Sequence, residues 1–408
     1  MVSTAVRYKE SPVDVASWNF SSACGRLSLD ADLKTLLAMP YRELSLQLPV
    51  RMDDGTLRVF RASRVLHSNA RGPAAGEIHL RPRADANLAF ALANSATWTS
   101  AVMNVPFGGA CGVIDCDPQS LTPREYEKLF RRFASRSHVV LGPFQDVAIA
   151  SSESEAALLL DEYSSLHGFT PACVAGKGPQ QGGAANFSKT RPRAAALALR
   201  ESAIYLDRNL QDLTIAILAT PENAADYLAE FASIGCTVVA LSDTRRAVHD
   251  DRGLEPLTIG KILEEAPAVT DAIESVLSTD CDVLVLASSE CALHATNAAR
   301  VRAAIVLEAA PLSVTPSADV VLRQQQALVI PDLVAASGAL IAAHVEWSAN
   351  LEKKQLHARD IHLALEKSIP AAVKAIFERT QKDQSSLRSA AYCIAVERVA
   401  RTERLRGI

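Results

Sequence analysis

Cysteine and histidine are the side chains best suited to act as nucleophiles, bases or metal ligands, and this chain scatters both. Its 408 residues include eight cysteines and nine histidines. No two cysteines form a C-x-x-C pair, and no group of histidines accompanies them at the spacing of a metal site. The pairs His67/His79 and His357/His362 are not spaced to share an ion either. We therefore expect reduced, mostly buried thiols and no metal.

A glycine-rich loop at 106–112, PFGGACG, is the local motif with the clearest chemical potential. Its backbone amides would serve as hydrogen-bond donors, and Cys111 lies inside it. A reactive thiol needs a nearby base or helix N-terminus to lower its pKa. The local sequence places no histidine there, so a passive small residue is the favoured interpretation and new cysteine chemistry the alternative.

Composition describes a soluble globular protein and excludes two classes of partner. Hydrophobic residues make up 49%, charged residues 22%, and the formal net charge is -4. Neither nucleic acid nor an acidic membrane surface is indicated. The N-terminus lacks a signal-peptide pattern, and no run reaches the roughly 18 to 20 apolar residues of a membrane helix. We expect a cytoplasmic protein.

The predicted helices and strands that must position any site fall into two halves, which differ in how helices and strands follow one another. The first half mixes strands and helices, with a hairpin turn at Asp54–Gly55, a helix near 84–104 and another starting at Thr122–Pro123. From about residue 190, helices alternate with short apolar strands at 213–219, 236–243, 281–288, 303–310 and 327–332. This alternation predicts a doubly wound parallel sheet.

A polar, glycine-rich segment at 176–190 predicts the boundary between two α/β domains. We assign 186–335 to a Rossmann-like domain. Residues 1–185 and 336–408 form the other domain, because the segment after Pro331 is helical and is expected to return. A cleft between the domains is the expected ligand site. The linker residues Lys177 and Lys189 are expected to be solvated.

Four stretches, at 48–73, 96–118, 238–254 and 329–351, together resemble the Glu/Leu/Phe/Val dehydrogenase family, of the glutamate dehydrogenase type. The resemblance implies an N-terminal α/β substrate and dimerisation domain, a Rossmann-like domain and a hexamer. It also implies oxidative deamination of an L-amino acid with hydride transfer to a nicotinamide.

The same resemblance places small or uncharged residues where the family carries its chemistry. Ala75 and Thr99 match two lysines that hold the substrate, and Cys111 matches the catalytic lysine. Ser151 stands where the proton-transferring aspartate is expected, and Ala343 where a substrate-contacting serine is. Asp146 matches the first aspartate of its motif, and Glu153 is the one nearby acid that would substitute. Loss of a group that acts in the transition state lowers the reaction rate by orders of magnitude. We therefore expect no catalytic residue in this chain.

The dinucleotide site shows the same pattern of replacement. The turn that should be glycine-rich carries Ala219, Thr220, Pro221 and Glu222. We expect Thr220 to cap a helix that begins with Pro221 and Glu222, and the Glu222 carboxylate to occupy the place of a phosphate. Ala195 replaces a threonine of the family, while Asp243 keeps an acid at the end of the next strand. We expect no cofactor, with NAD(P) the candidate if activity survives.

Three functions remain open from the sequence. The leading hypothesis is a regulatory or structural pseudoenzyme subunit that assembles with an active glutamate dehydrogenase paralogue, as a homo- or hetero-oligomer. The second is a non-catalytic small-molecule binding protein. The third is an NAD(P)-dependent oxidoreductase that acts on the CH–NH2 group of an amino acid or related substrate through a rebuilt site.

Overall fold

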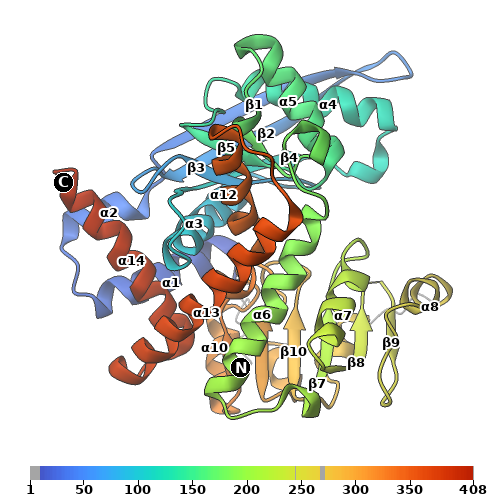
Figure 1. The fold of residues 1–408 in the computed structure, drawn as a ribbon, viewed down its shortest axis with the longest axis vertical. Helices are drawn as coiled ribbons and strands as arrows, with labels where there is room; N and C mark the ends of the chain where they lie inside the picture. Colours follow the sequence, from blue (N-terminus) through green and yellow to red (C-terminus); the bar gives the residue numbers. More distant parts are fainter. Residues whose placement is uncertain (1–9, 244, 267–271, 408) are drawn as a thin grey trace, which may run out of the picture.

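Two six-stranded sheets with flanking helices make up the protein (Figure 1). The computed structural model describes residues 10–243, 245–266 and 272–407. The two-domain α/β fold predicted from the sequence is confirmed. The boundaries at 185/186 and 335/336 stay a prediction; they fall near the start of helix α6 and at the end of helix α11.

The first sheet has the order β1-β2-β4-β3-β5-β6. Its strands are β1 (Arg42–Arg51), β2 (Leu57–Ser68), β3 (Ala74–Arg81), β4 (Gly109–Asp115), β5 (Asp146–Ile149) and β6 (Val174–Ala175). The predicted hairpin joins β1 to β2, and Gly55 accommodates its positive φ of 86°. Strand β4 starts at Gly109, so the second half of the expected glycine-rich loop is strand instead. It is strand because Gly109–Gly112 pair with β2.

Five helices accompany this sheet: α1 (Pro12–Arg26), α2 (Ala31–Ala38), α3 (Ala86–Val102), α4 (Pro123–Ser137) and α5 (Glu153–His167). Thr122 and Glu125 form a capping box that starts α4 at the predicted place. Helix α3 is almost wholly buried, and its Trp98 stacks on Phe20 of α1 with ring centroids 5.4 Å apart. Helix α3 is therefore a rigid support for any side chain that it presents to the cleft.

The second sheet has the order β12-β11-β10-β7-β8-β9. Its strands are β7 (Thr214–Leu218), β8 (Thr237–Ser242), β9 (Ala247–His249), β10 (Val283–Leu286), β11 (Ile305–Glu308) and β12 (Leu328–Ile330). All pairings are parallel, as predicted, except that β9 runs antiparallel to β8. The short connection between β8 and β9 leaves no room for a crossover, so the chain reverses there.

Two predicted helices of this half begin or end differently in the structure. Helix α7 (Ala224–Ser233) starts at Ala224, not at Thr220, because Asn223 folds back and its Oδ1 accepts the Thr220 N–H at 2.9 Å. The apolar spacing over 258–277 predicts one helix, whereas the structure has two short helices, α8 (Ile259–Glu265) and α9 (Ala272–Leu277). Ala266 is extended and ends the first; part of the expected helix, 267–271, lies outside the described residues.

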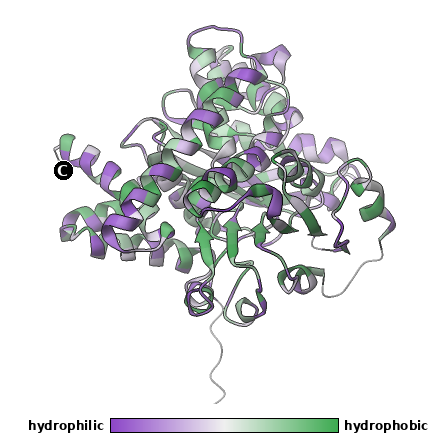
Figure 2. Ribbon diagram, turned by 60° about the horizontal axis from the view of Figure 1, so that its bottom comes forward, coloured by the Kyte–Doolittle hydropathy of each residue, from purple (hydrophilic) through white to green (hydrophobic). Residues whose placement is uncertain are grey.

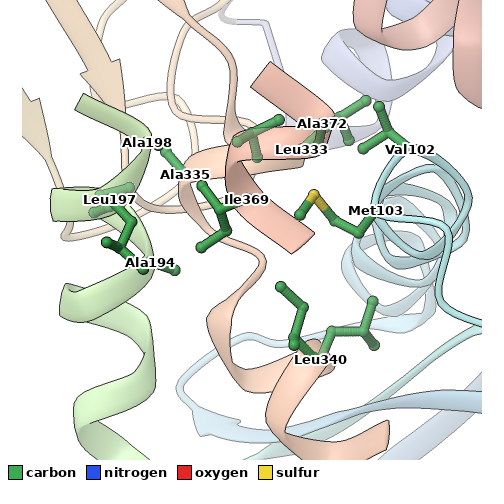
Figure 3. Close-up of a cluster of buried hydrophobic side chains, with 14 of the residues drawn as sticks. Val102, Met103, Ala194, Leu197, Ala198, Leu333, Ala335, Leu340, Ile369 and Ala372 are labelled. Carbon is green, nitrogen blue, oxygen red and sulfur yellow. The ribbon is translucent and has the colours of Figure 1, made fainter. Parts of the chain in front are cut away.

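The C-terminal helices pack on both halves. They are α11 (Asp332–Ala335), α12 (Gly338–Leu351), α13 (Ala358–Asp383) and α14 (Leu387–Leu405). Helix α12 contacts β5 and β6, α13 lies along α6 (Thr190–Tyr205), and α14 packs against α1 and α3. Figure 3 shows the shared core, where Met103, just after α3, and Leu197 of α6 face side chains of the returning segment such as Ile369.

Hydropathy follows this layering (Figure 2). The parallel strands of the second sheet are coloured hydrophobic, whereas many helices carry both hydrophobic and hydrophilic turns, as expected for helices with one buried face. No helix within the described ranges is long and apolar enough to cross a membrane.

Candidate active-site cleft

A cavity of about 120 Å³ lies between the two sheets. Strands β3 and β4 and helix α3 form one wall, and the loops after β10 and β11 form the other, with α6, α11 and α12 closing the base. Strands β3 and β4 approach closely here, since a Cβ on Gly76 would meet the Ala110 carbonyl oxygen at 1.6 Å. The cavity is therefore at the place where the sequence predicted a ligand site.

Strand β3 supplies the charged wall of this cavity. Successive side chains of a strand alternate between faces, so Ala75, Glu77, His79 and Arg81 share one face. Glu77 and His79 line the cavity, and their nearest polar atoms are 3.8 Å apart. Ala75 is fully buried beneath it.

Two ion pairs join β3 to elements across the cleft. Glu77 Oε1 lies 2.7 Å from Nη2 of Arg191, in the first turn of α6. Arg81 donates two hydrogen bonds to Glu290, in the loop after β10, at 2.7 and 3.0 Å. Each pair matches one cation with one carboxylate, so both arginines already have an anionic partner.

Electrostatics keep these pairs ionised. Burial raises the pKa of Glu77, but Arg191 and His79 oppose it and the net pKa is below the ordinary value. The pKa of Glu290 is likewise lowered, because Arg81 outweighs the effect of burial. Burial lowers the pKa of His79 against the pull of Glu77, so the imidazole tends to be neutral at pH 7.

Cys111 lines the cavity, but its thiol is poorly suited to act as a nucleophile. Burial raises the pKa of its thiol to about 12. Its Sγ donates to the Gly112 carbonyl at 3.5 Å, although His79 lines the same cavity. A thiol with so high a pKa carries almost no thiolate at neutral pH, which agrees with the interpretation of Cys111 as a passive residue.

The turn after β7 is built from its own side chains. Pro221 and Glu222 are exposed, Thr220 is half-buried and Ala219 is fully buried. Glu222 lies before the start of α7, so the predicted placement of its carboxylate within the first turn is wrong. At the end of β8, Asp243 Oδ1 accepts the N–H groups of Arg245 and Arg246 at 3.0 and 2.7 Å. Asp243 therefore caps a turn.

Tyr227 of α7 spans the carboxyl end of the second sheet. Its phenol is 1% exposed and donates to the Ala309 carbonyl at 3.2 Å, just after β11. Because β10 lies between β7 and β11, this contact crosses the crevice where the strand order reverses. Open α/β sheets bind their ligands in that crevice.

Two family models cover nearly all of the chain. The dimerisation domain of Glu/Leu/Phe/Val dehydrogenases matches residues 40–165, and the Glutamate/Leucine/Phenylalanine/Valine dehydrogenase model matches residues 185–407. The chain belongs to the Glu/Leu/Phe/Val dehydrogenase family.

Similar members of this dehydrogenase family are glutamate dehydrogenases. The chain is 33% identical to the glutamate dehydrogenase of Thermotoga maritima, over 98% of this chain and 99% of that protein. It is 30% identical to the NAD-specific glutamate dehydrogenase A of Halobacterium salinarum, over 98% and 94%. The crystal structure of a hetero-hexameric glutamate dehydrogenase from Thermus thermophilus, in a leucine-bound form, superposes with a TM-score of 0.91 at 30% identity over 99% of both chains.

The positions that the resemblance to the dehydrogenase family singled out are only partly brought together. Thr99 and Cys111 both line the cavity. Ala343 is buried on α12 and Ala195 on α6, outside the lining, while Ser151 is exposed and its N–H donates to Glu155 at 2.9 Å. Glu153 is exposed and does not reach the cavity.

The expectation for Lys177 is wrong. This lysine is fully buried, and its Nζ lies 2.5 Å from Oε1 of the equally buried Glu346 on α12. Glu346 also accepts the backbone N–H groups of Gly176 and Lys177, at 3.0 and 3.3 Å, which places the carboxylate beneath the linker. Lys189, in contrast, is 54% exposed, as predicted.

Sequence reasoning missed the cleft's own charges. Glu77, His79 and Arg81 stand at every second position of an interior strand, a spacing that would have placed them on one face. Glu290 lies in a loop between strands, and no local pattern sets it apart.

Proposed function

We propose that this chain is a non-catalytic subunit of the glutamate dehydrogenase type, which serves as a regulatory or structural partner of an active paralogue in the cytoplasm. One observation carries the proposal. Arg191, which lines the cavity, and Arg81, which pairs with the lining residue Glu290, are each held by a carboxylate of the chain itself.

An amino-acid dehydrogenase needs a cation for the substrate carboxylate, because charge-assisted pairing fixes the Cα hydrogen over the nicotinamide. A substrate that used Arg191 would have to displace Glu77, and one that used Arg81 would have to displace Glu290. Thr99 and Cys111, the other candidate positions at the cavity, are uncharged. The cleft therefore favours its internal ion pairs over an incoming amino acid.

The residues present do not fit a dinucleotide. A pyrophosphate needs close approach to backbone N–H groups at a helix start, and the turn from Ala219 to Asn223 contains no glycine. The Thr220 N–H already donates a hydrogen bond to the Asn223 side chain, so it is not free for a phosphate. Glu222 adds negative charge nearby. Tyr227 spans the crevice beside it.

A role in assembly is supported by the intact architecture and by one solved relative. The Thermus thermophilus glutamate dehydrogenase is a hetero-hexamer, and this chain shares its fold over the whole length. We propose that this chain likewise occupies positions in a hexamer beside a second, active subunit.

Co-expression with an active glutamate dehydrogenase of the same genome tests the proposal. A tag on this chain should retain the active subunit, and the mixed oligomer should oxidise glutamate with kinetics that differ from those of the active subunit alone. The chain purified alone should show no turnover of glutamate with NAD+ or NADP+. Turnover by the chain alone would establish the oxidoreductase alternative and end this proposal.

A small-molecule binding protein is the second candidate, and the cavity itself favours it. Its walls are largely apolar side chains, and its charged lining residues among those described are Glu77, Arg191, Glu290 and Asp332. A thermal-shift series with glutamate, leucine, NAD+ and NADP+ separates the candidates. Stabilisation by an amino acid alone would favour the binding protein, and stabilisation by a dinucleotide would favour the oxidoreductase.

A further inference from the structure

A second, strongly polar cavity of about 70 Å³ lies away from the cleft, between α1, α10 (Pro316–Gln324) and the start of α14. Three arginines line it, one from each helix: Arg26, Arg323 and Arg388. Its other lining residues among those described are serines, an asparagine and two aromatic residues, and none carries a carboxylate. The cavity is therefore positive.

Arg388 is the least exposed of the three, at 3%. Its Nη2 donates to Glu308 Oε2 at 2.8 Å, and its Nη1 lies 3.4 Å from Asp319 Oδ1. Its Nε is also buried, and no atom within the described ranges accepts a hydrogen bond from it. A buried guanidinium N–H without an acceptor is costly, so Arg388 has hydrogen-bonding capacity that the described residues leave unused.

The start of α14 adds donors from the backbone. Ser386 caps this 19-residue helix, and its Oγ accepts the Ser389 N–H at 3.2 Å. Ser386, Arg388 and Ser389 all line the cavity. The first N–H groups of a helix have no intrahelical partner, and the helix dipole favours an anion at this end.

Two carboxylates lie close by, and arginines hold both. Asp319 forms an ion pair with Arg323 on its own helix, four residues along, and also faces Arg388. Glu308 accepts from Arg388 on the side of β11. Both carboxyl groups thus lie on the protein side of Arg388, while Arg26 has no acidic partner within hydrogen-bond reach in the described part of the chain.

We propose that this cavity binds a small oxyanion of the phosphate class, either free or as the terminal group of a small metabolite. The cavity is small, at about 70 Å³, which suits a compact tetrahedral oxyanion. Three arginines and a helix start are the donors that such an anion requires.

Inorganic phosphate is the probe for the first experiment, on the full chain in a buffer free of other oxyanions. Isothermal titration calorimetry should show saturable binding of one phosphate per chain, and the melting temperature should rise with phosphate but not with chloride at equal ionic strength. Glycerol phosphate distinguishes the two sources of the anion. Binding as tight as that of phosphate assigns the terminal group of a metabolite, and binding of free phosphate alone assigns the inorganic ion.

Variants locate the binding. Arg26→Gln and Arg323→Gln change exposed arginines, so the fold should persist, and each should weaken phosphate binding by about tenfold or more. Arg300→Gln is the matched control, because Arg300 is 59% exposed and pairs with Glu274, much as Arg323 is 53% exposed and pairs with Asp319. Absence of saturable binding to the wild-type chain, or equal affinity in all three variants, would overturn the proposal.

Discussion

Arg81 on β3 and Glu290 after β10 form a bidentate ion pair that joins the two sheets across the cleft, with nitrogen–oxygen distances of 2.7 and 3.0 Å. Glu290 is 11% exposed and Arg81 is 32% exposed. The pair is therefore partly shielded from water, and its loss leaves a charge with poor solvation.

Replacement of Arg81 by glutamine should lower the free energy of unfolding by about 1–3 kcal/mol, because Glu290 keeps its charge and loses its partner. Urea denaturation measures this. Lys374→Gln is the control, since Lys374 is 65% exposed and its partner Glu378 is 63% exposed, and such a pair contributes less than about 1 kcal/mol. Equal effects of the two substitutions would show that the cleft pair does not stabilise the protein.

Glu308 should make stability depend on pH. Burial raises the pKa of this carboxyl to about 8, and Arg388 only partly opposes the shift. Between its ordinary value of 4.5 and about 8, the folded chain keeps a proton that the unfolded chain has lost. Stability should thus fall by about 1.4 kcal/mol for each pH unit in this window.

The variant Glu308→Gln lacks this titration, so its stability relative to the wild type should increase steadily from pH 5 to pH 8. Urea denaturation at several pH values in this window provides the measurement. Parallel pH profiles for the two proteins would mean that Glu308 is ionised throughout.

Cys111 should resist alkylation in the folded protein. With a pKa of about 12, its thiolate fraction at pH 8 is on the order of a thousandfold below that of an ordinary cysteine. Peptide mass spectrometry after brief iodoacetamide treatment should find Cys111 unmodified in the native chain and modified in urea. Rapid modification of native Cys111 would revive the idea of cysteine chemistry in the cleft.

Lys177 and Glu346 are both fully buried, so removal of one partner should be costly. Lys177→Met leaves the Glu346 carboxylate buried and should lower stability by about 3–5 kcal/mol. The double variant Lys177→Met with Glu346→Gln removes both charges, while the amide oxygen still accepts the linker N–H groups, so it should recover most of the loss. A double variant no more stable than the single one would contradict this assignment of the cost to an unpaired charge.

The sequence predicted much of this fold because its local signals agree with the tertiary structure. Thr122 and Pro123 start α4 where capping chemistry requires, and the apolar runs became the parallel strands of the second sheet. Failures occurred where a long-range or side-chain contact outweighs local preference. Asn223 delays the start of α7 by hydrogen bonding to Thr220, and Gly109–Gly112 became strand because β2 pairs with them.

The cleft was less predictable than the fold. Thr99 and Cys111, which the family pattern singled out, both line the cavity, while their role there stays a prediction. The ion pairs were not, because Arg81 and Glu290 are 209 positions apart and only the packing of the two halves brings them together. Lys177 was assigned to solvent because its glycine-rich surroundings are typical of a loop, yet α12 covers that loop with Glu346.

Arg388 of α14 donates a hydrogen bond from its Nη2 to Glu308 at the end of β11. Glu308 also accepts the Val314 N–H, in the loop that borders the cleft. During synthesis, β11 leaves the ribosome about 80 residues before this arginine. When the Rossmann-like half leaves the ribosome, its buried Glu308 therefore still lacks the Arg388 partner. This carboxyl group needs Arg388 of α14, so the Glu308–Arg388 pair forms only after a further 80 residues have been synthesised.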